Sequence, residues 1–165
     1  MIILFMLSIF KLSIGQSMGS LSEPKEKPDI LVGKVNRADI QKGEFSNYLY
    51  SEYRKYNPNL EILSKLKNSI YNKSILVVMG TWCHDSKEQV PRFFKILDQL
   101  DYNTSLVEII CVDRKKIAGT TDITHLDIER VPTFIFYADD IEVGRIIETP
   151  VLSIEEDLLN ILNDK

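Results

Sequence analysis

One uninterrupted apolar segment constrains the fold more than any other part of the sequence. Residues 75–79 are all apolar, which is typical of a strand buried on both faces of a sheet. Gly80 follows, and a helical pattern then runs over 85–100 with apolar positions three and four residues apart. A second apolar run lies at 106–112. A strand, a long crossover helix and a further strand predict a parallel pair with a right-handed connection.

The flanking segments predict an N-terminal helical extension and a C-terminal hairpin with a closing helix. Asn57-Pro58 separates the two helices of the extension because proline cannot continue a helix. Ser153 and Glu156 have the spacing of a capping box that starts the last helix. We therefore predict an α/β fold, with a central mixed β-sheet, helices on both faces and an N-terminal helical extension. The other expected elements are an edge strand or extended lead-in at 29–35, helices at 44–56 and 60–70, an irregular or weakly helical stretch at 115–129, strands at 133–137 and 141–147, and a helix at 153–162.

The composition is that of an ordinary globular protein. The 165 residues are 44% hydrophobic and 27% charged, which is enough for one domain with its own core. The net charge is -4 at pH 7, and the lysines are scattered among acidic residues. A nucleic-acid-binding domain would show a basic face, so nucleic acid is not expected as a partner. We expect a monomer.

The N-terminal residues differ in composition from the rest of the chain. Residues 2–10 are almost purely apolar, and Ser13 and Gly15 are small residues at the positions that precede a cleavage site. This pattern resembles a secretory signal peptide and predicts export to the periplasm or another extracytoplasmic space. The alternative is a buried N-terminal strand or helix in a cytoplasmic protein. A membrane span needs about 20 apolar residues, so no stable span is expected. The predicted division is a signal peptide at 1–15, a flexible linker at 16–28 and a domain at 29–165, made of an extension at 29–72 and a core at 73–165.

The connection between the first buried strand and its helix carries the candidate chemistry. Cys83 follows Trp82 where the helix begins, near unpaired backbone N–H groups and the positive end of the helix dipole, which stabilise a thiolate. Ser86 stands where a second cysteine would allow a dithiol cycle, so that cycle is impossible within the motif. Ser86 is instead a candidate hydrogen-bond donor to the sulfur. Protonated His84 would increase the reactivity of the thiolate, and Asp85 would oppose it by charge repulsion.

The other candidate ligands and thiols predict no second site. His84 and His125 are the two histidines, and no cysteine or histidine spacing matches a zinc site, so we expect no metal and no cofactor. Cys111 lies within the second apolar strand and is expected to be an inert core cysteine. The acidic run 155–157 is interpreted as the solvated start of the last helix.

Residues 73–162 resemble the thioredoxin family. The matching features are a strand followed by Trp82-Cys83, Pro91 in the next helix, Val131-Pro132-Thr133 before a strand, and a closing hairpin with Gly144. The resemblance implies a thioredoxin-like fold, a cis bond between Val131 and Pro132, and a groove beside Cys83 that receives substrate backbone. The extended N-terminus and the Trp-Cys-x-Asp-Ser motif look most like exported thioredoxin-like proteins of the Bacteroidetes type. The groove residues implied are Trp82, His84, Asp85, Val131, Pro132 and Thr133.

Three positions depart from the family pattern in a consistent way. Ser86 replaces the resolving cysteine, and Val77 occupies the place of the buried aspartate of the family. Ile109 lies near the place of the lysine that partners that aspartate. The aspartate–lysine pair of the family assists deprotonation of the resolving thiol, so it has no function in a chain without that thiol. The three departures together favour a site with a single thiol.

A single thiol restricts the possible reactions. A thiolate attacks a disulfide to form a mixed disulfide, and a second thiol must then release it. We therefore expect thiol–disulfide exchange at Cys83, such as isomerisation, deglutathionylation or covalent trapping of a client. The expected partners are protein thiols or disulfides and low-molecular-weight thiols. The alternatives are a redox-inactive binding module that uses the same groove, and an intermolecular disulfide dimer through Cys83.

Overall fold

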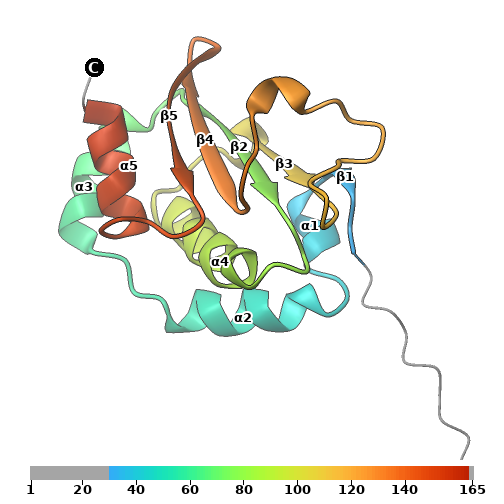
Figure 1. The fold of residues 1–165 in the computed structure, drawn as a ribbon. Coiled ribbons are helices and arrows are strands. Elements are labelled where there is room, and N and C mark those ends of the chain that lie inside the picture. Colours follow the sequence, from blue (N-terminus) through green and yellow to red (C-terminus); the bar gives the residue numbers. More distant parts are fainter. Residues whose placement is uncertain (1–29, 164–165) are drawn as a thin grey trace, which may run out of the picture.

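In the computed structural model of the protein the described residues are 30–163, so the predicted leader at 1–15 and linker at 16–28 lie outside them. A five-stranded mixed sheet with the strand order β1-β3-β2-β4-β5 forms the centre of the fold (Figure 1). The predicted α/β class and central mixed sheet are confirmed. The elements are β1 (Gly33–Val35), α1 (Arg37–Ile40), α2 (Phe45–Lys55), α3 (Leu60–Ser69), β2 (Ser74–Met79), α4 (His84–Gln99), η1 (Thr104–Leu106), β3 (Val107–Cys111), η2 (Thr124–Leu126), β4 (Thr133–Ala138), β5 (Ile141–Ile147) and α5 (Ile154–Asn163).

Strand β2 lies in the middle of the sheet, as its apolar sequence predicts. It pairs in parallel with β3 and antiparallel with β4, and α4 makes the crossover between the two parallel strands. The β4–β5 hairpin is antiparallel. Its turn residues Asp139 and Asp140 both have positive φ, at 50° and 63°, which is the conformation that a two-residue hairpin turn requires. The short edge strand β1 pairs antiparallel with β3.

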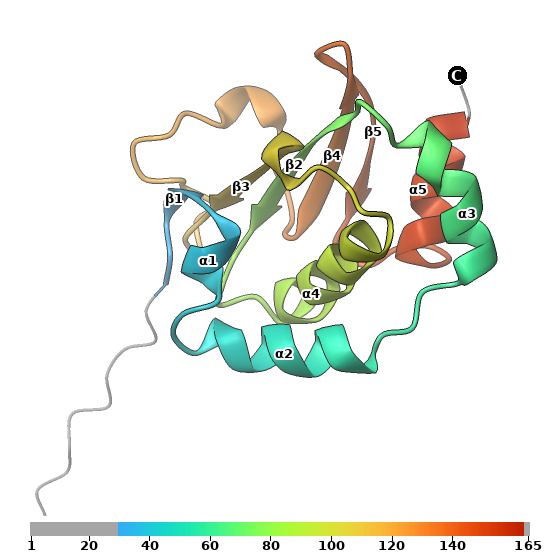
Figure 2. The same ribbon diagram turned by 180° about the vertical axis from the view of Figure 1, so that it is seen from behind.

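The two faces of the sheet are covered differently, and the prediction of helices on both faces is wrong. Side chains of all five α-helices pack into one core cluster on one face, together with Val77 and Phe134 of the sheet. The other face is covered by the connection between β3 and β4, through residues such as Ile123 and Leu126 of its η2 region. Figures 1 and 2 show the α-helices gathered around one side of the strands. The stretch 115–129 is too polar to form an amphipathic helix, so one 3-10 turn and a loop take that place.

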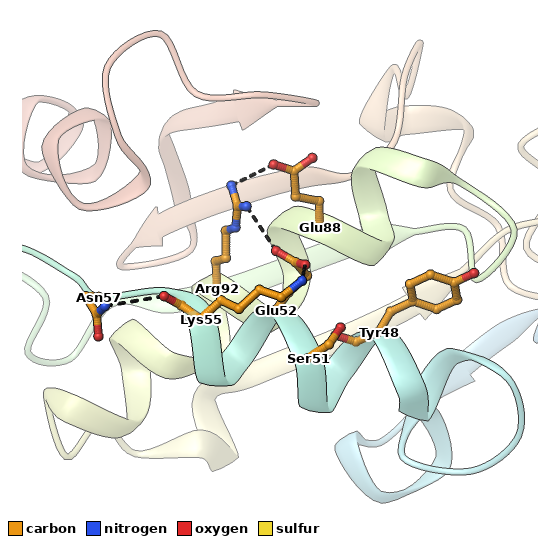
Figure 3. A network of polar contacts seen from close by, with 7 residues as sticks. All are labelled: Tyr48, Ser51, Glu52, Lys55, Asn57, Glu88 and Arg92. Atoms are coloured by element: carbon orange, nitrogen blue, oxygen red, sulfur yellow. Dashed lines mark hydrogen bonds and ion pairs between the residues drawn. The ribbon is translucent and has the colours of Figure 1, made fainter.

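Helix α2 of the extension is held against α4 by ion pairs as well as apolar contacts. Arg92 of α4 bridges Glu52 of α2, at 3.0 Å, and Glu88 of its own helix, at 2.7 Å (Figure 3). Glu52 also accepts from Lys55 at 3.0 Å. Near the start of α4, the ammonium group of Lys87 lies 4.3 Å from the centre of the Tyr48 ring. The extension is therefore fixed along the length of the helix that begins at Cys83.

A second polar cluster joins α1 and α2 to the end of α4. Arg37 binds the carboxylate of Asp98 with two hydrogen bonds, at 2.6 and 2.7 Å, and Tyr53 donates to the same carboxylate at 2.7 Å. The guanidinium also lies 4.6 Å above the Phe94 ring. Burial alone raises the pKa of Asp98, but the hydrogen bonds and the charge of Arg37 outweigh burial and lower it below its ordinary value.

Glu155 corrects the interpretation of 155–157 as a solvated run. Its side chain is only 3% exposed. One carboxylate oxygen accepts from the hydroxyl of Tyr56 at 2.5 Å and the other from the backbone N–H of Asn59 at 2.9 Å. Burial, reinforced by this bond, raises the pKa of Tyr56. The carboxylate thus joins the connection between α2 and α3 to α5, whereas the predicted capping contact of Ser153 with Glu156 is confirmed at 3.2 Å.

The Tyr56–Glu155 bond predicts a stability effect. Replacing Tyr56 with phenylalanine leaves a buried carboxylate with one partner fewer, so the free energy of unfolding should fall by about 1–2 kcal/mol in chemical denaturation. Tyr50→Phe is the matched control, because Tyr50 lies on α2, just before Tyr56 in the chain, with 65% of its surface exposed. Equal effects of the two substitutions would contradict this role for Glu155.

The Arg37–Asp98 pair predicts a pH dependence. Because the pKa of Asp98 is lower in the folded chain, the pair contributes stability above the ordinary value of 3.8, and this contribution is lost as the pH falls through the folded-state pKa. Asp98→Asn should therefore lower the free energy of unfolding by about 2 kcal/mol near pH 7 and by much less near pH 2. Asp101→Asn, at an exposed position just beyond α4, should change neither value. A loss that is the same at both pH values would contradict the assignment.

Candidate functional site

The topology brings three connections together at one end of β2. The loop with Cys83 follows β2, and Val112 follows the parallel strand β3 at the same end. Val131 precedes the antiparallel strand β4, so it also lies at this end. The Val112 N–H donates to the Met79 carbonyl at 2.8 Å and joins two of these connections. The segment before β1 reaches the same end, where Leu31 N–H donates to the Thr81 hydroxyl at 3.3 Å.

Cys83 is the N-cap residue of α4, which begins at His84, one residue before the predicted start at Asp85. Its backbone is extended, its N–H donates to the Gly80 carbonyl at 2.9 Å, and its carbonyl accepts from Lys87 N–H at 3.1 Å. The thiol is partly exposed and donates to the carbonyl oxygen of Val131 at 3.0 Å. The sulfur thus lies at the N-terminal end of a 16-residue helix.

Ser86 is placed to fix the loop. Its side chain is fully buried, and its hydroxyl oxygen accepts from the backbone N–H of Gly80 at 3.2 Å. In the part of the chain that the structure describes, the hydrogen bond of the Cys83 sulfur is made with Val131 and not with Ser86. The residue in the place of a second cysteine thus joins the end of β2 to the first turn of α4.

Trp82 lies in the loop between β2 and α4, and its indole contacts both Val112 and Gly80. Its ring N–H donates to the Val112 carbonyl at 2.8 Å. A Cβ added at Gly80 would lie 2.7 Å from the indole atoms Cε2 and Nε1, closer than side-chain carbons approach one another. The glycine therefore allows the ring to pack flat beside the strand end next to Cys83.

The segment facing Cys83 has the cis peptide bond between Val131 and Pro132 that the resemblance implies. Three contacts fix it: the Thr133 hydroxyl donates to the Arg130 carbonyl at 2.7 Å, Glu148 N–H donates to the Pro132 carbonyl at 2.7 Å, and Arg130 pairs with Glu148 at 2.8 Å. Val131 and Thr133 are 3% and 2% exposed, so their side chains pack inward. The backbone of this segment, rather than its side chains, faces the thiol.

The other residues considered from the sequence take no part in the contact between Cys83 and Val131. His84 is exposed and Asp85 half-buried, as the first two residues of α4. No group of three or more side chains that could hold a metal comes together within residues 30–163. Cys111 is fully buried in β3, and burial, with a smaller contribution from the charge of Asp39, raises the pKa of its thiol to about 12. The prediction that Cys111 is a core cysteine is confirmed.

Val77 and Ile109 are direct partners in the β2–β3 register. They are 0% and 3% exposed and belong to the helix-covered core. The two positions interpreted as replacing an acid–lysine pair are thus adjacent, and both are apolar. Neither position carries a charge.

Sequence reasoning missed one residue of the site. Arg114 follows β3, and its guanidinium lies 5.0 Å from the centre of the Trp82 ring. The run Arg114-Lys115-Lys116 is visible in the sequence, but only the parallel, side-by-side pairing of β2 and β3 brings it to Trp82. The loop is closed by Asp113, whose carboxylate accepts from the N–H groups of Lys115 and Ile117 at 2.8 and 2.9 Å.

The fold of the chain is shared with a solved protein of unknown function. No protein-family model and no curated protein matches the chain. A crystal structure of a protein of unknown function from Pseudomonas aeruginosa is similar, with a TM-score of 0.55 and 14% identity, over 80% of this chain and 89% of that chain. An HIV epitope scaffold is similar over 72% of this chain and 72% of that chain, at 14% identity and with a TM-score of 0.45. The likeness to the first shows a common fold and no function.

The helices of the described residues include none with the length and apolar character needed to cross a bilayer.

The packing of Trp82 on Gly80 gives a direct prediction. Gly80→Ala should displace the indole, break its bond to Val112 and lower the free energy of unfolding by about 1–3 kcal/mol. Trp82 is the single tryptophan, so its fluorescence emission reports the displacement without labelling. The emission maximum should shift to longer wavelength as the ring becomes more exposed. An unchanged spectrum in the variant would show that the ring does not depend on this glycine.

Proposed function

We propose that this chain is a monothiol thiol–disulfide exchange protein with a thioredoxin-like fold that acts through a mixed disulfide at Cys83. The observation that carries the proposal is the position of the partly exposed thiol, at the N-terminus of α4 and 3.0 Å from the carbonyl before the cis proline. A helix N-terminus stabilises a thiolate, and the thiolate is the nucleophile of disulfide exchange.

The reaction conserves electrons. The Cys83 thiolate attacks one sulfur of a disulfide, a new bond forms to Cys83, and the other half leaves as a thiolate. A second thiol, from the substrate or from a small molecule, then attacks the mixed disulfide and returns Cys83 to the thiolate. The second step needs an external thiol because Ser86 occupies the resolving position and Cys111 is fully buried.

Two further parts of the proposal concern the groove and the compartment. We place Val131 and Pro132 at the wall that receives the substrate backbone and Trp82, His84 and Asp85 at the side of Cys83. Partners are protein thiols or disulfides and low-molecular-weight thiols, and the site of action is extracytoplasmic. The rigidity of the segment 130–133, with its three fixed contacts, supports a preformed wall.

Peptide mapping after reaction with glutathione disulfide tests the proposal. Folded protein should form a glutathione adduct at Cys83, and faster than the same cysteine does in the urea-unfolded chain. Cys111 is the internal control, because it should react only after unfolding. No adduct at Cys83 in the folded protein would refute the exchange function.

Client capture separates exchange from the alternative of a redox-inactive binding module. Cys83→Ser removes the nucleophile and keeps a hydroxyl that donates to the Val131 carbonyl, so the site geometry is preserved. Proteins retained by the native chain in non-reducing conditions should be lost with this variant and released by added thiol. Equal retention by both forms would support the binding module instead.

A further inference from the structure

We propose that the loop 113–117 makes the Cys83 site selective for disulfides that carry carboxylates, such as the mixed disulfides of small acidic thiols. The inference rests on the proposed exchange function and names the substrate class of the same site. It begins with the one charged group that the structure places against the side chain next to Cys83: the Arg114 guanidinium, 5.0 Å from the centre of the Trp82 ring.

The three basic side chains of this loop have no ion-pair partner among residues 30–163. They are the consecutive residues Arg114, Lys115 and Lys116. In contrast, Arg37, Arg92, Arg130 and Arg145 each pair with a carboxylate. A chain with a net charge of -4 thus presents three cations without an ion pair among the described residues, in a loop that contacts Trp82, the residue before Cys83.

The loop is also held in place, so its charge has a fixed position. The Asp113 carboxylate is occupied by two backbone N–H groups of the loop, and Asp113 N–H donates to the Ile117 carbonyl at 3.0 Å. Trp82 is fixed in turn by its bond to Val112. The loop and the indole are therefore joined to the same strand end.

The stacked arrangement suits a carboxylate ligand. A guanidinium that lies over an aromatic ring uses its face for the ring and keeps the N–H groups at its rim available. Those groups match the two oxygens of a carboxylate in a paired geometry. A disulfide with carboxylates near its sulfurs would be attracted to the loop while one sulfur reaches Cys83, and the attack then forms the Cys83 disulfide and releases the other half as a thiolate.

The test compares three small disulfides of different charge. Glutathione disulfide is anionic, hydroxyethyl disulfide is neutral and cystamine is cationic, and rates of adduct formation at Cys83 are measured by mass spectrometry at low and high salt. Arg114→Gln should slow the anionic disulfide about threefold or more, leave the neutral one unchanged and accelerate the cationic one. The difference between the native chain and the variant should shrink as salt increases. Lys115→Gln with Lys116→Gln should act in the same direction.

Arg54→Gln is the matched control, since Arg54 is an exposed arginine on α2 that forms no ion pair among the described residues. It should change none of the three rates. If Arg114→Gln slows all three disulfides equally, Arg114 acts by holding Trp82 and the charge selectivity is wrong. If the native chain reacts with all three but shows no salt dependence, the inference fails while exchange stands. If even the neutral disulfide gives no adduct, the exchange function itself fails.

Discussion

The pairing of β2 with β3 on one side and β4 on the other is the constraint on which the rest of the structure depends. Because β3 runs parallel to β2, the segment after β3 begins beside the loop that carries Cys83. Because β4 runs antiparallel, the segment before β4 ends at the same place, with its cis proline. The apolar residues of β2 are thus what brings a thiol, a backbone carbonyl and a basic loop to one end of the sheet.

The residues around Cys83, at this end of the sheet, fit a site with a single thiol. The Ser86 hydroxyl accepts a hydrogen bond from the Gly80 N–H and so fixes the loop, and Val77 and Ile109, which are partners in the β2–β3 register, are both apolar. Cys83 is the N-cap residue of α4, and Cys111 is fully buried. These features support the proposal that the site exchanges disulfides with help from an external thiol rather than oxidising or reducing a substrate alone.

Local sequence patterns predicted most of the helices and strands. The features that they did not predict depend on contacts between residues far apart in the sequence. The run 75–79, the capping pair Ser153 and Glu156, and the hairpin around 139–140 depend on neighbours in sequence, and each is found in the structure. Helix α1 is only four residues long and has no periodicity to detect. The burial of Glu155 depends on Tyr56, which is 99 residues away, and the stacking of Arg114 depends on the β2–β3 register. Neither of these two contacts has a signal in the sequence. The lack of an α-helix over the second face could be recognised only once the arrangement of the sheet was known.

The fate of an isolated Cys83–glutathione adduct tests the central claim most directly. The purified adduct is followed by intact mass at several concentrations of added glutathione. A single-thiol site predicts that the adduct persists without added thiol and that its rate of loss rises in proportion to the thiol concentration. Loss of the adduct in the absence of thiol, or at a rate that does not depend on it, would show that the chain resolves its own mixed disulfide and would contradict the account.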